Sequence, residues 1–274
     1  MTEFAEPAPY RVRARNTAAD STNKIHDDAV ARSFGFAGGL VPGITAYAYL
    51  SHVPAALWGR PWLQRGVLEA RFLRPVYDGE HIVVEPGPLE QTDDGEAIGL
   101  TLRGPAGDAC VGGRATLPAH APTPPSLRDY PVAPLPPEPP AASPAVLAAI
   151  GQLGTVEVPF DPLRAERYLD SVGEGLDLYR RDGLAHPGWL LQWANWVLVA
   201  NVALGPWVHT ASTVRHYSSL EGTGTVSTRG RVADLYQRRG NQIVELDLLL
   251  VAGGSTPLAH VRHTAIYELR PRVG

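Results

Sequence analysis

One short sequence pattern occurs twice in this chain of 274 residues. Residues 40–43 read Leu-Val-Pro-Gly and open an apolar run, and residues 185–188 read Ala-His-Pro-Gly and open a second run about 145 residues later. An arginine-bearing segment typical of a strand follows each run, at residues 71–80 and 215–223. Two landmarks in the same order at similar offsets indicate a duplicated unit of helix and sheet.

The composition narrows the classes of partner and cofactor. An apolar fraction of 44% and a net charge of -4 describe a soluble globular chain without the basic field that binds nucleic acid or an anionic membrane. The single cysteine, Cys110, cannot form an intrachain disulfide, and this favours the cytoplasm, as does an N-terminus without a signal-peptide pattern. The strand histidines lack metal-ligand spacing, so we expect structural roles for them and no metal or cofactor. They are His209, His216, His260 and His263.

The two apolar runs predict buried helices. Residues 188–208 are almost numerous enough to cross a bilayer, but Gln192, Asn195 and Pro206 interrupt the run. A helix that is apolar on nearly every side is instead buried when a sheet wraps around it. The first run, residues 43–59, is milder and leads into Gly-Arg-Pro, a stop signal for a helix. We therefore predict one wrapped helix in each half and no membrane span.

Strand-like segments joined by short turns follow each predicted helix. They are residues 67–73, 81–85, 97–102 and 109–117 in the first half, and 210–217, 224–236, 242–252 and 258–269 in the second. Strands joined by short turns are antiparallel, and an apolar helix needs a sheet face to bury it. The predicted class is α+β, a tandem or double hotdog with domains at 1–117 and 146–274. The proline-dense segment 118–145 reads as a semi-rigid linker rather than a PxxP recognition segment.

The first half resembles a known family. Residues 23–26 (Asn-Lys-Ile-His), 35–36 (Gly-Phe) and 38–43 resemble the entry of MaoC-like hotdog dehydratases and (R)-specific enoyl-CoA hydratases, whose pattern runs G-D-x-N-P-x-H, then G-F and a glycine-rich step into the helix. Residues 72–80 are similar to the family's next strand, F-x-x-P-V-x-x-G-D. The resemblance implies hydration of a trans-2-enoyl thioester, or the reverse dehydration, on acyl-CoA or another acyl thioester.

The resemblance also assigns roles to individual residues. His26 takes the place of the histidine that activates water, and Asn23 that of an orienting asparagine. Gly43 stands where a backbone N–H at the helix start binds the thioester oxygen, and free donors with a positive dipole end suit the charge that develops there. We expect Gly39 and Pro42, on the glycine-rich step, to contact substrate.

One departure from the family pattern concerns its acid. Ser21 stands where the family carries an aspartate, and Lys24 replaces the usual proline. A serine can position water but cannot accept its proton at neutral pH. Either Asp20, Asp27 or Asp28 substitutes through a local shift, or this half performs no hydration.

The second half retains a partial version of the motif. Glu174 falls at the position of the aspartate and Tyr179 at that of the histidine, while His186 precedes the second helix. We predict that all three contact substrate. A composite site that pairs His26 with Glu174 across the two halves is one alternative. Arg74 is available for the phosphates of a coenzyme A thioester.

Three functions stay open. The first is a hydratase or dehydratase in which His26 is the base and Gly43 the oxyanion donor. The second is a hotdog thioesterase in which Asp27, Asp28 or Glu174 activates water against the carbonyl. The third is a non-catalytic acyl-thioester binding or partner subunit. A double hotdog supplies internally the pairing that single-hotdog proteins obtain by dimerising, so a homodimer of this chain also stays open.

Overall fold

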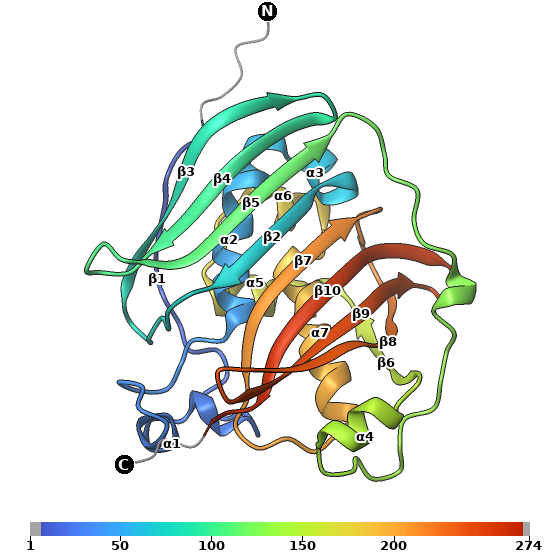
Figure 1. Ribbon diagram of the computed structural model, residues 1–274. Coiled ribbons are helices and arrows are strands. Elements are labelled where there is room, and N and C mark those ends of the chain that lie inside the picture. The colour runs from blue at the N-terminus through green and yellow to red at the C-terminus, as the bar shows by residue number, and fades with distance from the viewer. Residues whose placement is uncertain (1–6, 271–274) are drawn as a thin grey trace, which may run out of the picture.

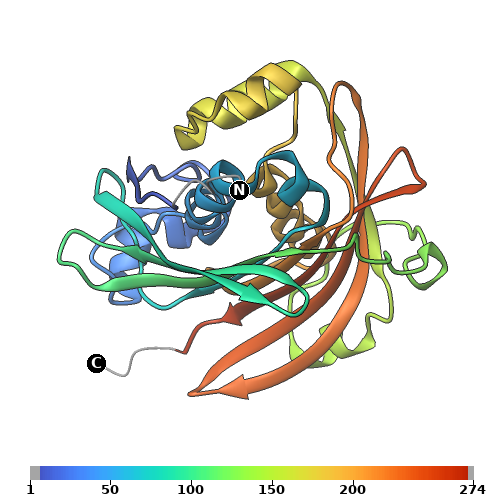
Figure 2. The same cartoon turned by 90° about the horizontal axis from the view of Figure 1, so that it is seen from above.

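The computed structural model describes residues 7–270, whose ten strands form one antiparallel sheet (Figure 1). Figure 2 shows this sheet curving around one side of two central helices. The strands are β1 (Tyr10–Arg13), β2 (Val67–Phe72), β3 (His81–Thr92), β4 (Gly95–Arg103), β5 (Ala109–Pro118), β6 (Leu153–Phe160), β7 (Val208–His216), β8 (Gly224–Arg238), β9 (Asn241–Ala252) and β10 (Thr256–Glu268).

The strand order shows the duplication. The sheet runs β1-β3-β4-β5-β2 and then β7-β10-β9-β8-β6. Read from its own edge, the second half has the order β6-β8-β9-β10-β7, which repeats that of the first. Strands β2 and β7 meet at the centre, with Val67 opposite Arg215 and Arg71 opposite Ala211. The two halves therefore share one continuous sheet.

The central helices are α2 (Gly43–Trp58) and α7 (Pro187–Asn201), and they contact each other. Both are buried on most sides, as their apolar runs predict. The last helical residue of α7 is Asn201, whose side-chain amide accepts from and donates to the backbone of Gly154 in β6, and Pro206 follows. The second run therefore stops being helical before residue 208. Within residues 7–270 no helix is long and apolar enough to span a membrane.

Shorter helices complete each half. They are η1 (Lys24–His26), α1 (Asp28–Ser33), α3 (Arg60–Arg65), η2 (Leu127–Asp129), α4 (Pro144–Ala149), α5 (Pro162–Val172) and α6 (Asp177–Asp182). Helix α5 starts at a local signal, because Asp161 at its N-cap accepts from the N–H of Arg164 and Pro162 occupies its first turn. It ends at Gly173 with φ 70°. Figure 2 places α5 on the side of the central helices that faces away from the sheet.

The proline-rich segment follows the side of the second half from β5 to α4 (Figure 1). Tyr130 donates a hydrogen bond of 2.8 Å to the buried carboxylate of Asp247 and packs with Leu249 and Val251. Near the end of the segment, the N–H of Ala142 donates to the carbonyl of Ala203. These contacts attach the segment to the sheet and to the loop after α7, and the domain boundaries at 117 and 146 stay predictions.

Candidate functional site

His26 is oriented by the backbone of the glycine-rich step. Its Nδ1 lies 2.7 Å from the carbonyl oxygen of Leu40. A carbonyl only accepts, so Nδ1 carries the proton and Nε2 is left with a lone pair. Burial lowers the pKa of His26, against an opposing effect of the Leu40 hydrogen bond. At neutral pH the ring is therefore uncharged, with Nε2 available to take a proton.

Asn23 joins the His26 segment to the second half. Its Oδ1 accepts from the N–H of Trp207 at 3.2 Å, and its Nδ2 donates to the Trp207 carbonyl at 3.0 Å. The side-chain amide thus pairs with one backbone unit as a neighbouring strand would. Because Nδ1 of His26 carries the proton, the same Nδ2 also donates a long hydrogen bond of 3.4 Å to Nε2 of His26.

Two cavities meet beside His26. The narrower, about 210 Å³, lies between the start of α2 and strands β2 and β7. The wider, about 810 Å³, lies among residues 15–23, α5 and α7. Five residues line both cavities: Asn23, His26, Pro42, Asn195 and Trp207. His26 can therefore act on a molecule that extends from one cavity into the other.

The start of α2 faces the narrower cavity. Pro42 occupies the N-cap and has no side chain that could accept a hydrogen bond, so the N–H groups of Gly43 and Ile44 at the start of the helix have no partner among the described residues. They carry the positive end of the helix dipole. Gly43, the first helical residue, lines this cavity, and a Cβ there would lie 2.8 Å from Nδ1 of His209. A larger residue at this position collides with His209.

His209 belongs to a buried chain of hydrogen bonds. Its Nε2 lies 2.8 Å from Oγ of Ser212, and that hydroxyl lies 3.0 Å from Nδ1 of His263. Burial lowers the pKa of His209 well below its ordinary value, and lowers that of His263 to about 3. Both rings are neutral near pH 7. His209 also lines the narrower cavity, so the structural role expected for these histidines stays a prediction.

Two of the acids considered as replacements are occupied elsewhere. Asp27 caps α1 by accepting from the N–H of Val30 at 3.0 Å. Asp28 accepts from the N–H of Gly39 at 2.8 Å and pairs with Arg32, and these two groups lower the pKa of its carboxyl. Gly39, predicted to contact substrate, is not among the described residues that line either cavity. A Cβ on Gly39 would collide with the main chain of residue 26, so close packing explains this glycine.

The remaining residues from the first-half motif divide between the cavities. Ser21 donates to the carbonyl of Asn23 at 3.2 Å, and both Ser21 and Asp20 line the wider cavity. Of the three acids considered, only Asp20 shares a cavity with His26. Arg74 lines the narrower cavity, and its exposed side chain pairs at 3.3 Å with Asp108, which is not one of the lining residues.

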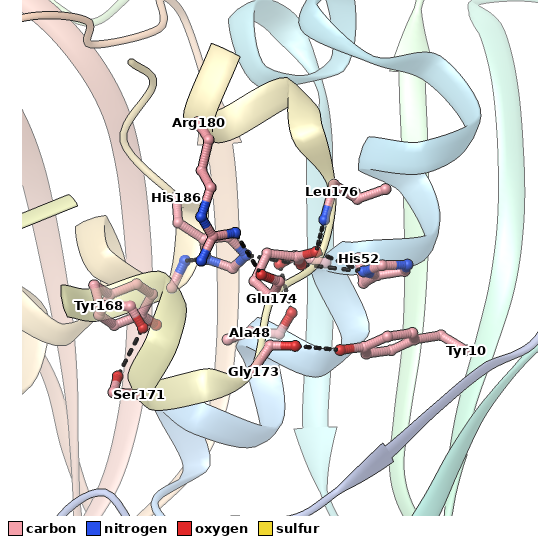
Figure 3. A network of polar contacts seen from close by, with 12 residues as sticks. Tyr10, Ala48, His52, Tyr168, Ser171, Gly173, Glu174, Leu176, Arg180 and His186 are labelled. Atoms are coloured by element: carbon pink, nitrogen blue, oxygen red, sulfur yellow. Dashed lines mark hydrogen bonds and ion pairs between the residues drawn. The ribbon is translucent and has the colours of Figure 1, made fainter. Parts of the chain in front are cut away.

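The second-half motif forms a separate buried cluster (Figure 3). Glu174 lies between His52 of α2 and His186, with Nδ1 of His52 at 2.9 Å and Nε2 of His186 at 3.5 Å from its carboxylate oxygens. The N–H of Leu176 donates to the same carboxylate at 2.8 Å. Burial alone would raise the pKa of Glu174, but hydrogen bonds from His186 and His52 and their charges hold it well below its ordinary value.

The same cluster closes the start of α7. His186 is its N-cap, and Nδ1 of His186 accepts from the N–H of Gly188 at 3.0 Å. Tyr179 is buried against the His186 ring, with ring centroids 4.7 Å apart. On the other side of the cluster, Tyr10 stacks on His52 at 3.6 Å. The N–H of Gly188, which could otherwise bind a ligand at this helix start, is therefore bonded within the protein.

These contacts correct one hypothesis. Both carboxylate oxygens of Glu174 face the histidines of its own cluster, so the composite pair with His26 is not formed. Among the described residues, those that line the two cavities beside His26 do not include Glu174, Tyr179 or His186. The three residues lie together, away from both cavities, and their predicted contact with substrate stays a prediction.

Two cavity residues were missed in the sequence. Trp207 precedes β7 and Asn195 lies within α7, and both come from the second half. The Oδ1 atom of Asn195 is buried and has no hydrogen-bond partner among residues 7–270. Its signal in the sequence is that a polar residue interrupts a strongly apolar run.

No family model and no curated protein matches this sequence. Solved structures do match. A chain from Chloroflexus aurantiacus J-10-fl, named as a MaoC domain protein dehydratase, has a TM-score of 0.63 at 13% identity, with 97% of this chain and 94% of that chain covered. A conserved hypothetical protein from Mycobacterium tuberculosis with a double hotdog fold has 0.59 at 15%, with 96% of each chain covered.

Another solved structure with the same fold is named for a different activity. A chain from Novosphingobium aromaticivorans DSM 12444, named as a thioesterase, has a TM-score of 0.57 at 11% identity, with 97% of each chain covered. These likenesses confirm the predicted class, an α+β double hotdog, and the resemblance in fold to MaoC-like dehydratases. Because dehydratases and thioesterases share this fold, the choice between them depends on the site.

Proposed function

We propose that the protein hydrates trans-2-enoyl thioesters, or dehydrates 3-hydroxyacyl thioesters, at the site around His26. One observation carries the proposal. A neutral histidine, whose unprotonated Nε2 accepts only a long hydrogen bond of 3.4 Å from Asn23, shares a cavity with the uncapped start of α2. The first group can take a proton from water, and the second can stabilise an oxyanion, as hydration of an enoyl thioester requires.

The reaction needs only one titrating side chain. The thioester oxygen accepts a hydrogen bond from the first N–H of α2, at Gly43. His26 takes a proton from water at Nε2 while the water oxygen bonds to C3, and the electron pair of the C2–C3 double bond moves toward the thioester oxygen. His26 then returns the proton to C2, which leaves a 3-hydroxyacyl thioester. A serine at position 21 is compatible with this scheme, because no second base is used.

The two cavities suggest how the substrate lies. We assign the pantetheine arm to the narrower cavity, because its lining includes Arg74, a cation that could exchange its pairing with Asp108 for a phosphate. The acyl group then extends past His26 into the wider cavity. The thioester lies at the residues that both cavities share, next to Nε2 of His26.

The thioesterase alternative depends on a carboxylate. Asp27 and Asp28 are engaged around α1, and Glu174 is engaged by His52 and His186. Asp20 lines the wider cavity and is therefore the acid on which a thioesterase reaction would depend.

A paired assay tests the proposal. The protein is incubated with trans-2-enoyl-CoA thioesters of several chain lengths, and loss of enoyl absorbance and release of free thiol are followed together. Loss of absorbance without thiol, abolished in His26→Ala, is the expected result. Thiol release that is lost in Asp20→Asn would replace the proposal with a thioesterase. Saturable binding without either signal would indicate a binding subunit.

A further inference from the structure

A groove lies on the face of the sheet that points away from the central helices. Ala70 of β2 lies opposite Gly113 of β5, and a Cβ on Gly113 would collide with Leu50 of α2. Residues directly opposite each other share a face, so Ala70 faces that helix. Successive side chains of a strand alternate between the two faces. Arg71 therefore points away from the helices, and it lines a groove of about 690 Å³ on this outer face.

Small side chains form the floor of this groove. The row that crosses the sheet from Arg71 runs through Ala211 of β7 and Thr264 of β10 to Glu245 of β9. Beyond the small residues stands Tyr236, whose hydroxyl donates to the Glu245 carboxylate at 3.0 Å. A floor of small residues between longer ones leaves a hollow, and its volume is that of a small-molecule site.

Positive charge is in excess around this hollow. Its charged lining residues are Arg71, Arg238, Arg239, Arg262, Glu69 and Glu245. Arg262 lies 4.0 Å from the carboxylate of Asp247, and the other three arginines pair with no carboxylate among residues 7–270. By contrast, Arg114 on β5 pairs with Glu90 at 2.6 Å. Guanidinium groups gathered in a hollow without counter-charges favour an anionic ligand, and their planar donors match phosphate oxygens.

The groove meets the narrower cavity where β2 ends. The residues that line both are Phe72, Leu73, Thr210 and Ile266. Leu73 directly follows β2 and is exposed. A ligand can therefore extend from His26 through the narrower cavity and past Leu73 to the arginines of the groove.

We propose that this groove binds phosphate groups at the nucleotide end of coenzyme A, while the pantetheine arm passes Leu73 into the narrower cavity. The inference rests on the proposed function and specifies the carrier of the acyl group. Coenzyme A has several phosphates, so Arg74 and the groove arginines can contact it together. A carrier protein would instead need a docking surface of roughly 800 Å² and could not reach the floor of the groove.

A pair of thioesters tests the proposal on one variant. Arg71→Gln combined with Arg238→Gln should raise KM for an enoyl-CoA about tenfold and keep kcat, because charge-assisted contacts to phosphate are lost. KM for the same enoyl group on pantetheine, which lacks the nucleotide, should stay unchanged. Arg114→Gln removes a charge outside the groove and should leave both KM values as in the wild type. Calorimetric titration with free coenzyme A measures the lost affinity without turnover.

Several outcomes overturn the inference. A wild-type KM for the enoyl-CoA in the double variant does so, and so does an equal rise of KM for the pantetheine thioester or in Arg114→Gln. If the double variant impairs only a thioester carried by an acidic protein, the groove belongs to a protein partner and the inference is wrong. A wild-type protein that binds coenzyme A through these arginines but hydrates no thioester supports the groove and refutes the proposed function alone.

Discussion

The two central helices begin in opposite ways. Helix α2 starts at Gly43 behind a proline that cannot cap it, next to a cavity. Helix α7 starts with His186, whose Nδ1 accepts from the N–H of Gly188 and whose Nε2 faces Glu174. The strand order around the two helices is the same. Whether a helix start can bind a ligand is therefore decided here by its cap and not by the fold.

The surroundings of His26 and His52 also differ between the two halves. Beside His26 the nearest side-chain partner is the neutral amide of Asn23, whereas His52 donates to the carboxylate of Glu174. A neutral partner leaves a histidine able to take and return a proton. A carboxylate forms a buried polar pair with it instead. We infer that the first half carries the chemistry and that the second half is a closed, stabilising copy.

The largest expected effect comes from removing the base. His26→Ala should lower kcat for hydration by about 10² to 10⁴-fold, the usual contribution of a positioned general base. Its melting temperature should stay close to that of the wild type, because His26 makes one backbone hydrogen bond and lies at a cavity.

His52→Ala is the control from the other half. It removes a partner of the buried Glu174 carboxylate and should lower the melting temperature while kcat of the folded enzyme is kept. Equal effects of the two substitutions on kcat would show that the halves are not specialised as inferred.

The second prediction concerns the stability that the second half contributes. Glu174→Ala should reduce the free energy of unfolding by about 3–5 kcal/mol, the usual cost of breaking a buried ionic pair. The carboxylate is buried, and its removal leaves His52 and His186 without their shared acceptor. Chemical denaturation at pH 7 measures the change, and a loss below 1 kcal/mol would contradict the stabilising role.

The pH dependence of this stabilisation has a definite sign. The folded pKa of Glu174 is lowered, so its contribution is complete above the pKa of the unfolded carboxyl, about 4.3, and is lost as the pH falls toward the folded value. The difference in melting temperature between wild type and Glu174→Gln should therefore be level above about pH 5 and shrink as the pH falls below about 4.3. A difference in melting temperature that grows as the pH falls would contradict a lowered folded pKa for Glu174.

The same small substitution at the two helix starts gives the third comparison. Gly43→Ala places a methyl group against His209 beside the oxyanion site, and should lower kcat/KM about 10- to 100-fold through the displaced N–H. Gly188→Ala collides with the hydroxyl of Tyr168 in a closed region, and should instead destabilise the protein by about 1–3 kcal/mol. Steady-state kinetics and thermal melts on both variants separate the two effects. A loss of activity in Gly188→Ala with a loss of stability in Gly43→Ala would place the reaction in the second half instead of the first.

The elements that the sequence predicted well carry strong local signals. Strands β3 and β9 start after turns at Asp78-Gly79 and Gly240-Asn241, and glycines at these turns adopt positive φ. Edge strands β1 and β6 were missed because they are short or lead directly from an irregular segment into the edge of the sheet. Helix α5 was missed although Asp161 and Gly173 mark its ends.

The sequence predicted only those residues of the site that lie close together along the chain. His26, Asn23 and Gly43 lie within one short motif, and the structure brings His26 and Asn23 into contact and places Gly43 on the cavity that they line. Trp207 and Asn195 come from the other half, and no spacing along the chain specifies that they meet His26. The environment of Glu174 likewise depends on His52, which lies 122 residues away.

The smallest expected effect concerns the pH profile of His26. A base must be uncharged, and burial lowers the pKa of His26 below 6.5, so kcat/KM should be level above pH 7 and fall only below 6.5. Asn23→Asp would place a carboxylate about where Nδ2 lies, 3.4 Å from Nε2, and copy the histidine–carboxylate pair of the second half. A nearby negative charge favours the protonated ring, so the inflection should move upward and activity at pH 7 should decrease. An inflection that stays in place in this variant would mean that the neutral amide is not what keeps His26 a base.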